Sequence, residues 1–342
     1  MARDCTEVWG RGNPDSFCGP HNPSKERKPS ELRSQLSRNL WAITCYFNPL
    51  GYQSRLKNYR IFRQRLIVPL VAVELSHDGQ YHLRADDAEI LIQIKCEDFL
   101  WQKERLLNVA LQSVPQDCPA VAWLDCDVVF ENPDWPQRAS ELLQSFKIIE
   151  PFEFTYETRK DGLPGEVDSK EDEGYSLMYA LAKGIAPPDI LRGNMRLEKR
   201  ISSGLAWVAH RAILDKHGFY DACVMGSGNR AIACATLGRF DDAVHYLQMN
   251  PTWAKHYLAW ARPFFDTVQG SVGYLPGGLF HLWHGDLRHR QYAERHKFLS
   301  DSGFDPTKDI FIDDNGAWRW SGSKTNMEKY IRGYFKSRRE DG

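Results

Sequence analysis

The sequence has almost no net charge, because 44 Lys and Arg residues are balanced by 45 Asp and Glu residues. This balance provides no global field for binding a polyanion, although it does not exclude a local basic patch. Long apolar runs are also missing. Charges interrupt every candidate membrane span within a few residues, and the opening stretch MARDCTEVWGRGNPDSF has no apolar core of the signal-peptide type. We therefore expect a cytoplasmic protein without a membrane span.

Paired cysteines and nucleotide-triphosphate loops are absent as well. The eight cysteines form no CxxC pair, and several lie inside apolar, strand-like runs, so we expect most of them to be buried thiols rather than disulfides. No G-x-x-x-x-G-K-[ST] run is present. The chain is 42% hydrophobic and 12% aromatic, which is ample for a packed core. Disorder is therefore not expected for most of the chain.

Apolar segments alternate with helix-like segments in the first part of the chain. Strands are predicted in LWAITCYF, LIVPLVAVEL, AEILIQIKC and AVAWLDCDVVF, and residues 52–66 and 100–114 carry apolar side chains at helical spacing. This order predicts an α/β fold with a mostly parallel central sheet flanked by helices. Ligands of such sheets bind beyond the carboxyl ends of the strands, where Asn48, Glu74 and the segment from Asp125 to Asp127 fall.

Composition divides the chain into four predicted parts. Residues 1–38 are polar and rich in Pro and Ser, which predicts a flexible N-terminal arm. Residues 39–132 form the sheet half just described, and residues 133–300 form a second half. Within it, the charged loop 155–173 contains Gly and Pro and is suited to act as a lid. Residues 301–342 are a C-terminal extension.

Two acidic residues and two histidines predict a metal site. In a continuous strand Asp125 and Asp127 would point to the same face, and parallel carboxylates repel unless a cation lies with them. His281 and His284 follow an apolar segment late in the chain. Imidazole and carboxylate together suit an ion such as Mn²⁺, with Mg²⁺ as the other candidate. The competing interpretation is an acidic strand end, one core histidine and one surface histidine.

A partly open metal site, a crevice at the sheet edge and a closing loop together fit the transfer of a sugar from a nucleotide diphosphate. The metal would bridge the diphosphate and neutralise the charge of the leaving group. A closing lid would exclude water, which otherwise hydrolyses the donor.

Five motifs come in the order and spacing of GT-A glycosyltransferases, and they resemble most the beta-4-galactosyltransferase and chondroitin-type group. The motifs are FNPLGYQSRLKNY, VAVEL, FLWQKERLLNVALQSVPQDCPAVAWLDCDVVFEN, SSGLAWVAHRAILDKHGFYD and HLWHG. The resemblance covers about residues 40–290. It implies a GT-A fold in which residues 39–132 bind the nucleotide sugar, residues 133–300 bind the acceptor, and a hexosyl group is transferred.

The resemblance also implies individual roles. The donor-side positions are Asn48, Pro49, Glu74, Lys103, Asp125 and Asp127. Lys103 would face the phosphates, Asp125 the ribose or a metal-bound water, and Asp127 the metal. His281 and His284 reproduce the three-residue spacing of the later metal ligands, with His281 in place of the family's methionine. Ser203 and Gly204 would line the acceptor side.

One departure leaves the general base open. Where the inverting family has a Gly-Glu-Asp run, this chain has Asn229 and Arg230. An amide cannot accept the acceptor's proton. The base comes from elsewhere, with Asp221, Asp286 and Glu198 as candidates, or the reaction retains configuration, or the enzyme is impaired. Arg230 would then contact the donor or the acceptor.

The sequence thus predicts a metal-dependent glycosyltransferase whose acceptor is unidentified. A glycan is favoured, and a modified nucleic-acid base is another candidate. Two alternatives stay open: a metal-dependent phosphohydrolase or nucleotidyltransferase, and a non-catalytic sugar-binding relative. We expect the aromatic segment from Trp253 to Phe265 to belong to the core rather than to an acceptor platform.

Overall fold

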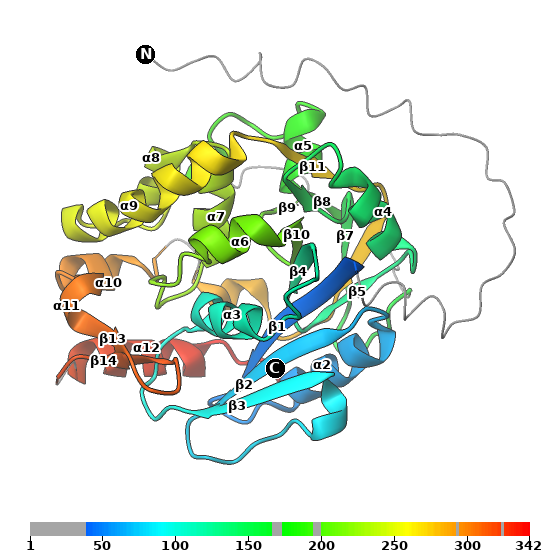
Figure 1. The fold of residues 1–342 in the computed structure, drawn as a ribbon. Helices are drawn as coiled ribbons and strands as arrows, with labels where there is room; N and C mark the ends of the chain where they lie inside the picture. Colours follow the sequence, from blue (N-terminus) through cyan, green and yellow to red (C-terminus); the bar gives the residue numbers. More distant parts are fainter. Residues whose placement is uncertain (1–38, 166–172, 194–199, 292–293, 323–324) are drawn as a thin grey trace, which may run out of the picture.

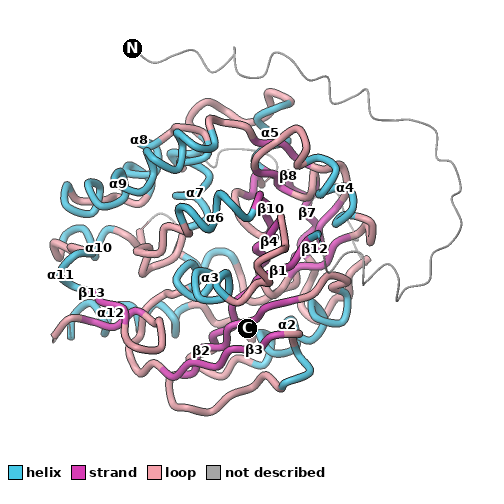
Figure 2. Tube along the Cα trace, in the orientation of Figure 1, coloured by secondary structure: helices cyan, strands magenta, loops and turns pink. Residues whose placement is uncertain are grey.

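The fold is centred on a seven-stranded sheet with helices on both faces (Figure 1, Figure 2). The computed structural model describes residues 39–165, 173–193, 200–291, 294–322 and 325–342. The predicted N-terminal arm and Glu198 lie outside these described residues. The strand order is β11-β6-β10-β4-β1-β2-β3. Four of the neighbouring pairs are parallel and two are antiparallel, so the predicted fold class is confirmed.

The parallel part of the sheet follows from the apolar segments predicted as strands. It contains β1 (Leu40–Phe47), β2 (Leu70–Ser76), β3 (Ile90–Lys95) and β4 (Ala120–Leu124). Strand residues alternate between the two faces. Ile43 and Phe47 belong to the cluster that contains α3 (Lys103–Gln112), whereas Ala42 belongs to the cluster that contains α2 (Gln53–Arg65). Because both faces are covered, β2 is buried along its whole length.

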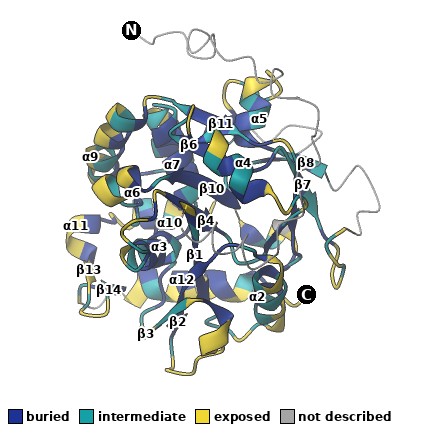
Figure 3. Ribbon diagram, turned by 45° about the vertical axis from the view of Figure 1, so that its right-hand side comes forward, coloured by how far each residue is buried: buried dark blue, intermediate teal, exposed yellow. Residues whose placement is uncertain are grey.

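The second half adds the antiparallel strand and most of the helices. β10 (Ala206–His210) lies antiparallel between β4 and β6 (Ile148–Glu150), and β11 (Val272–Tyr274) closes that edge. Helices α6 (Arg211–His217), α7 (Gly228–Thr236), α8 (Phe240–Tyr246) and α9 (Pro251–Val268) gather on one side in Figure 1. Trp253, Tyr257 and Phe264 of α9 are fully buried, which confirms the core prediction for these three aromatic residues. Figure 3 shows the same division, with buried strands inside and exposed positions on the outer helix surfaces.

The prediction of one continuous strand in AVAWLDCDVVF is wrong. Strand β4 of the first sheet ends at Leu124. The chain then turns through residues 125–127 and enters β5 (Val128–Phe130), which belongs to a second sheet. Asp125 and Asp127 lie in this turn, outside the first sheet, whose two faces are covered. The backbone amide of Asp125 donates to the Leu205 carbonyl at 2.7 Å, which fixes the turn between the two sheets.

The second sheet places this turn beside the histidine motif. Its order is β5-β12-β7-β8-β9, with β7 (Phe154–Glu157), β8 (Glu173–Ser176), β9 (Ile201–Ser202) and β12 (Gly278–His281). The predicted lid 155–173 therefore starts within β7, and its residues 166–172 lie outside the described part of the chain. The predicted helix in GYSLMYALAKG is confined to α5 (Leu177–Ala182), because the preceding residues pair in β8.

The C-terminal residues return to the first half of the chain. The remaining elements are α4 (Trp135–Leu142), α10 (Lys297–Asp301), α11 (Pro306–Asp309), β13 (Ile310–Ile312), β14 (Trp318–Trp320) and α12 (Thr325–Ser337), with short 3-10 turns at Ala85–Asp87, Ile190–Arg192 and Leu287–Arg290. Phe335 stacks on Trp101 with ring centroids 5.9 Å apart. Asp341 accepts hydrogen bonds from the amides of Gln53 and Ser54 at the start of α2. The tail thus lies against residues 39–132.

Cysteine placement and helix composition agree with the sequence predictions where they are described. The free thiols among the described residues are Cys45, Cys96, Cys118, Cys126, Cys223 and Cys234, and all except Cys126 are buried. None of the described helices has both the length and the apolar character needed to cross a membrane.

Glu150 predicts a specific pH dependence of stability. Its side chain is fully buried in β6, and burial raises its pKa well above the usual value, against the opposing hydrogen bond from the Met178 amide at 2.7 Å. Unfolding above the ordinary glutamate pKa therefore releases a proton, so stability falls with rising pH by up to ~1.4 kcal/mol per pH unit. Glu150→Gln should remove this slope in urea titrations between mildly acidic and mildly alkaline pH. Parallel slopes in both proteins would contradict the prediction.

Candidate active site

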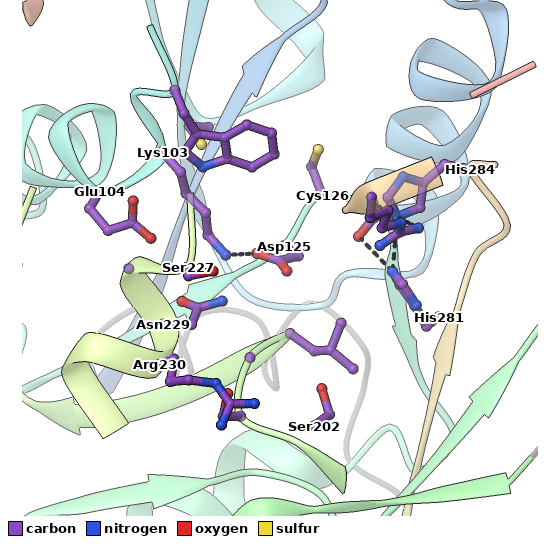
Figure 4. Close-up of a pocket in the computed structure, with 18 of the residues that line it drawn as sticks. Lys103, Glu104, Asp125, Cys126, Ser202, Ser227, Asn229, Arg230, His281 and His284 are labelled. Atoms are coloured by element: carbon purple, nitrogen blue, oxygen red, sulfur yellow. Dashed lines mark hydrogen bonds and ion pairs between the residues drawn. The ribbon is translucent and has the colours of Figure 1, made fainter. Parts of the chain in front are cut away.

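A cavity of about 420 Å³ lies where the two sheets meet, at the N-terminal ends of α3 and α7 (Figure 4). It brings together nine of the residues that the sequence predicts for the site. These are Lys103, Asp125, Asp127, Ser203, Gly204, Asn229, Arg230, His281 and His284. Five others do not line it, namely Asn48, Pro49, Glu74, Asp221 and Asp286.

Asp127, His281 and His284 form one compact ligand cluster. Their donor atoms all lie within 4.8 Å of one another. Strand pairing explains this proximity, because His281 ends β12 opposite Val128 of β5, directly after the Asp127 turn. The Leu282 amide also donates to the Asp127 carbonyl at 2.8 Å. His284 Nε2 is 3.2 Å from Asp127 Oδ2, and His281 Nε2 is 3.1 Å from His284 Nε2.

Each histidine of this cluster has a glutamate beside its other ring nitrogen. His281 Nδ1 is 2.8 Å from Glu157 Oε2, since Glu157 of β7 is the strand partner of His281. His284 Nδ1 is 3.9 Å from Glu340 Oε1, near the C-terminus. A carboxylate on Nδ1 orients the imidazole and leaves Nε2 as the ligand atom. Both Nε2 atoms therefore point to the same place as the Asp127 carboxylate.

The electrostatics of the cluster suit a cation. Burial would raise the pKa of Asp127, but His284 and His281 outweigh it and hold that pKa below its usual value. Burial, helped by Arg290, lowers the pKa of His284 to about 4, so its ring is neutral at pH 7. Burial alone would lower the pKa of His281. The Glu157 carboxylate beside its ring outweighs burial, so the pKa of His281 is raised above its usual value. At neutral pH the cluster therefore offers the Asp127 carboxylate and the neutral ring of His284 to a cation.

The residues of the cluster fit a divalent ion. Asp127 Oδ1 is buried and has no hydrogen-bond partner among the described residues. Arg290 Nη2 is 2.9 Å from His284 Nε2, and its positive charge opposes a cation at that nitrogen. One carboxylate and two imidazoles are a donor set that Mn²⁺ or a similar ion accepts. The cluster also leaves coordination positions open for a ligand from the cavity.

Asp125 lies apart from this cluster and pairs with Lys103. Lys103 is the first residue of α3, and its side chain is nearly buried. Burial opposes protonation, yet Asp125 and Glu104 together raise the pKa of Lys103, so its charge is retained. Lys103 and the ligand cluster line the same cavity. An anionic ligand held at the metal cluster would thus meet a second positive group.

Two predicted donor-side residues brace the chain instead of lining the cavity. Glu74 is buried, and its carboxylate accepts from the amides of His82 at 2.6 Å and Leu83 at 3.2 Å. Asn48 holds a turn, because its Oδ1 accepts from the Tyr52 amide and its Nδ2 donates to the Tyr52 carbonyl, both at 2.9 Å. Pro49 belongs to the same turn.

The two predicted base candidates are also away from the cavity lining. Asp221 accepts from Arg105 at 3.0 Å and from Asn108 Nδ2 at 2.9 Å, which ties the loop after α6 to α3. Asp286 has half its side chain exposed and pairs with Arg288. Neither Asp221 nor Asp286 is among the residues that line the cavity.

The opposite wall contains the predicted acceptor-side residues. Gly204 leaves room for the Asn229 side chain, because an added Cβ would lie 2.6 Å from Asn229 Nδ2 and that side chain would have to shift. Arg230 is buried, donates to the Ile190 carbonyl at 2.8 Å and lies 4.2 Å from the Tyr246 ring centroid. Arg230 thus holds this wall together, while Ser203 and Asn229 present polar atoms on it.

Several lining or supporting residues were not predicted. They are Arg55, Trp101, Glu104, Glu157, Arg200, Arg338 and Glu340. Glu104 is adjacent to Lys103 in the sequence, so its position in the helix could have indicated it. Glu157 and Glu340 depend on strand pairing and on the return of the C-terminal tail, for which the local sequence contains no signal.

Glu157→Gln is predicted to weaken Mn²⁺ binding about 10–100-fold, the range found for outer-shell partners of metal-binding histidines. The amide keeps the size of the side chain but removes the charge that orients His281. Isothermal titration with Mn²⁺ measures the change. Glu173→Gln, a neighbouring β8 position outside the cavity lining, is the matched control. Unchanged Mn²⁺ affinity in Glu157→Gln would argue against the orienting role.

Comparison with known proteins gives a likeness in overall arrangement only. No model of a known protein family matches the chain, and no curated protein matches it either. Among solved structures, glucosyl-3-phosphoglycerate synthase of M. tuberculosis aligns with 89% of this chain and 94% of its own, at 12% identity and a TM-score of 0.40. The same synthase in complex with Mn²⁺, UDP-glucose and phosphoglyceric acid gives 12% identity and a TM-score of 0.41 over the same shares. These values are too low to assign the chain to a family. Neither structure is a beta-4-galactosyltransferase or a chondroitin-type transferase, so the comparison does not support that part of the predicted resemblance.

Proposed function

We propose that this protein is a metal-dependent glycosyltransferase that uses a nucleotide-diphosphate sugar as donor. The observation that supports this most directly is the convergence of His281 Nε2, His284 Nε2 and Asp127 at the edge of the cavity, each histidine backed by a glutamate. Such a site can hold a divalent ion with open coordination positions. The adjoining cavity can hold a nucleotide and a sugar.

In such a transfer, different residues of the cavity would have different roles. When bound, the divalent ion would act as a Lewis acid toward the diphosphate. Asp127, His281 and His284 would hold it. Lys103 would bind a phosphate oxygen as a charge-assisted donor while Asp125 keeps it oriented. Gly204 would allow an acceptor to approach closely on the opposite wall. In this proposal residues 39–132 bind the donor and residues 133–300 bind the acceptor.

The decisive experiment incubates the protein with Mn²⁺ and a panel of nucleotide sugars, beginning with UDP-glucose, and measures release of nucleoside diphosphate. We expect release from one donor, its loss in EDTA and its loss in His284→Ala. Asp286→Asn, a partly exposed carboxylate outside the cavity lining, is the matched control. If no donor is bound in a metal-dependent way, the proposal is wrong.

A phosphohydrolase or nucleotidyltransferase is the second candidate from the sequence. Two-metal phosphoryl transfer needs a second ion about 4 Å from the first. Among the described residues, Asp127, His281 and His284 are the one group of acidic, histidine or cysteine side chains arranged for an ion. Release of sugar phosphate or of nucleoside monophosphate in the same assay would favour this candidate over sugar transfer.

A further inference from the structure

Glu104 is a carboxylate in the cavity for which the fold itself has no evident use. It is the second residue of α3, its side chain is 2% exposed, and it lines the cavity. A Cβ atom added to Gly228 would overlap the carboxyl group of Glu104, so the carboxyl lies directly against the first turn of α7. Only glycine at position 228 leaves room for it.

The neighbouring charged groups are already engaged with other partners. Lys103 pairs with Asp125, and Asp221 pairs with Arg105. Glu104 also lies near enough to the buried thiols of Cys45 and Cys223 to help raise their pKa. Burial is the main reason that the pKa of Glu104 is raised to about 7, with Lys103 and its own backbone amide acting in the opposite direction and Asp125 and Asp221 adding to the rise. Among the described residues, no other side chain donates a hydrogen bond to the carboxyl oxygens of Glu104.

The position of Glu104 matches what a displacement at a sugar carbon requires. An acceptor must attack from the side opposite the leaving diphosphate, so its base belongs on the wall away from the metal cluster. Figure 4 shows Glu104, Ser227 and Asn229 on one side of the cavity, and His281 and His284 on the other. Glu104 presents a carboxylate from α3 beside the first turn of α7, which contains Asn229.

We propose that Glu104 is the general base that takes the proton from the acceptor hydroxyl. This role rests on the proposed glycosyltransferase function. The acceptor oxygen forms a bond to the anomeric carbon of the donor sugar. The bond between that carbon and the diphosphate oxygen breaks, and its electron pair leaves with the nucleoside diphosphate. The acceptor's proton goes to the carboxylate of Glu104. A single displacement of this kind inverts the anomeric configuration.

The test measures nucleoside diphosphate release with Mn²⁺ and UDP-glucose, or whichever panel donor is turned over, with water or azide as the acceptor. Water must lose a proton during attack, whereas the azide anion has none to lose. In the wild-type protein we expect hydrolysis to rise with pH through about 7. In Glu104→Gln we expect hydrolysis to fall about 10²–10⁴-fold and to lose that rise. Transfer to azide should stay close to the wild-type rate.

The controls separate this role from a structural one and from failure of the function. Glu150→Gln is the matched control, since it also replaces a buried carboxyl of raised pKa but lies outside the cavity lining. Asp221→Asn tests the rival base. Loss of azide transfer together with hydrolysis in Glu104→Gln would show a structural role and overturn the proposal. Unchanged hydrolysis in Glu104→Gln, or loss of the pH rise only in Asp221→Asn, would overturn it as well. If the wild-type protein turns over no donor, the glycosyltransferase function fails and the base role fails with it.

Discussion

Replacing Asp127 with alanine is expected to weaken Mn²⁺ binding by more than about 100-fold, beyond the range seen for outer-shell partners, and to abolish donor turnover. Asp127 is the one carboxylate of the ligand cluster. Without it, two imidazoles and the nearby Arg290 guanidinium remain, and the guanidinium repels a cation. Isothermal titration or the electron paramagnetic resonance signal of free Mn²⁺ measures the loss directly and needs no substrate.

The matched control for this prediction is Asp125→Asn, two residues away in the same turn. Asp125 pairs with Lys103 and stands outside the ligand cluster. Its replacement should leave the affinity for Mn²⁺ within a few-fold while it weakens donor binding, because Lys103 loses the group that orients it. The prediction is wrong if both variants lose Mn²⁺ equally, since the acidic pair would then act as a unit. It is also wrong if Asp127→Ala binds Mn²⁺ normally.

The parts of the fold that could be predicted are those set by local pattern. Apolar runs gave β1, β2 and β3, and helical spacing gave α2 and α3, because burial on both sheet faces leaves a clear trace in sequence. The strand break after Leu124 could not be predicted in this way, since Val128 to Phe130 continue the apolar pattern. What ends β4 is pairing with a second sheet, which depends on residues about 150 positions away.

The candidate site divides along the same line. Asp127, His281 and His284 could be predicted because their residue types and spacing suit an ion. For Glu74 the sequence does not distinguish a ligand-binding role from a structural one, because a carboxylate at a strand end can serve either. In the structure its carboxylate accepts hydrogen bonds from the backbone amides of residues 82 and 83. The sequence indicates which polar groups lie at the edge of the sheet. It does not indicate which of these groups already form hydrogen bonds within the folded protein.

Replacing Trp207 with alanine is predicted to cost about 3–5 kcal/mol of unfolding free energy, the usual range for a large aromatic residue in a core. Trp207 is the second residue of β10 and is 1% exposed. It is the strand partner of Trp123 in β4, and the two rings stack with centroids 6.1 Å apart and planes 4° apart. The cavity left by alanine could not close without moving both strands.

The same change should also disturb the cavity wall that contains Ser203 and Gly204. Trp207 Nε1 donates to the Ser203 carbonyl at 3.3 Å, and Ser203 lines the cavity beside Gly204. Urea denaturation followed by circular dichroism measures the stability loss, and Trp207→Phe is the control because it retains most of the apolar volume. We expect the phenylalanine variant to lose less than half as much stability, yet to lose the hydrogen bond to Ser203. Equal losses in both variants would mean that the hydrogen bond, rather than the packing between β4 and β10, holds this part of the sheet.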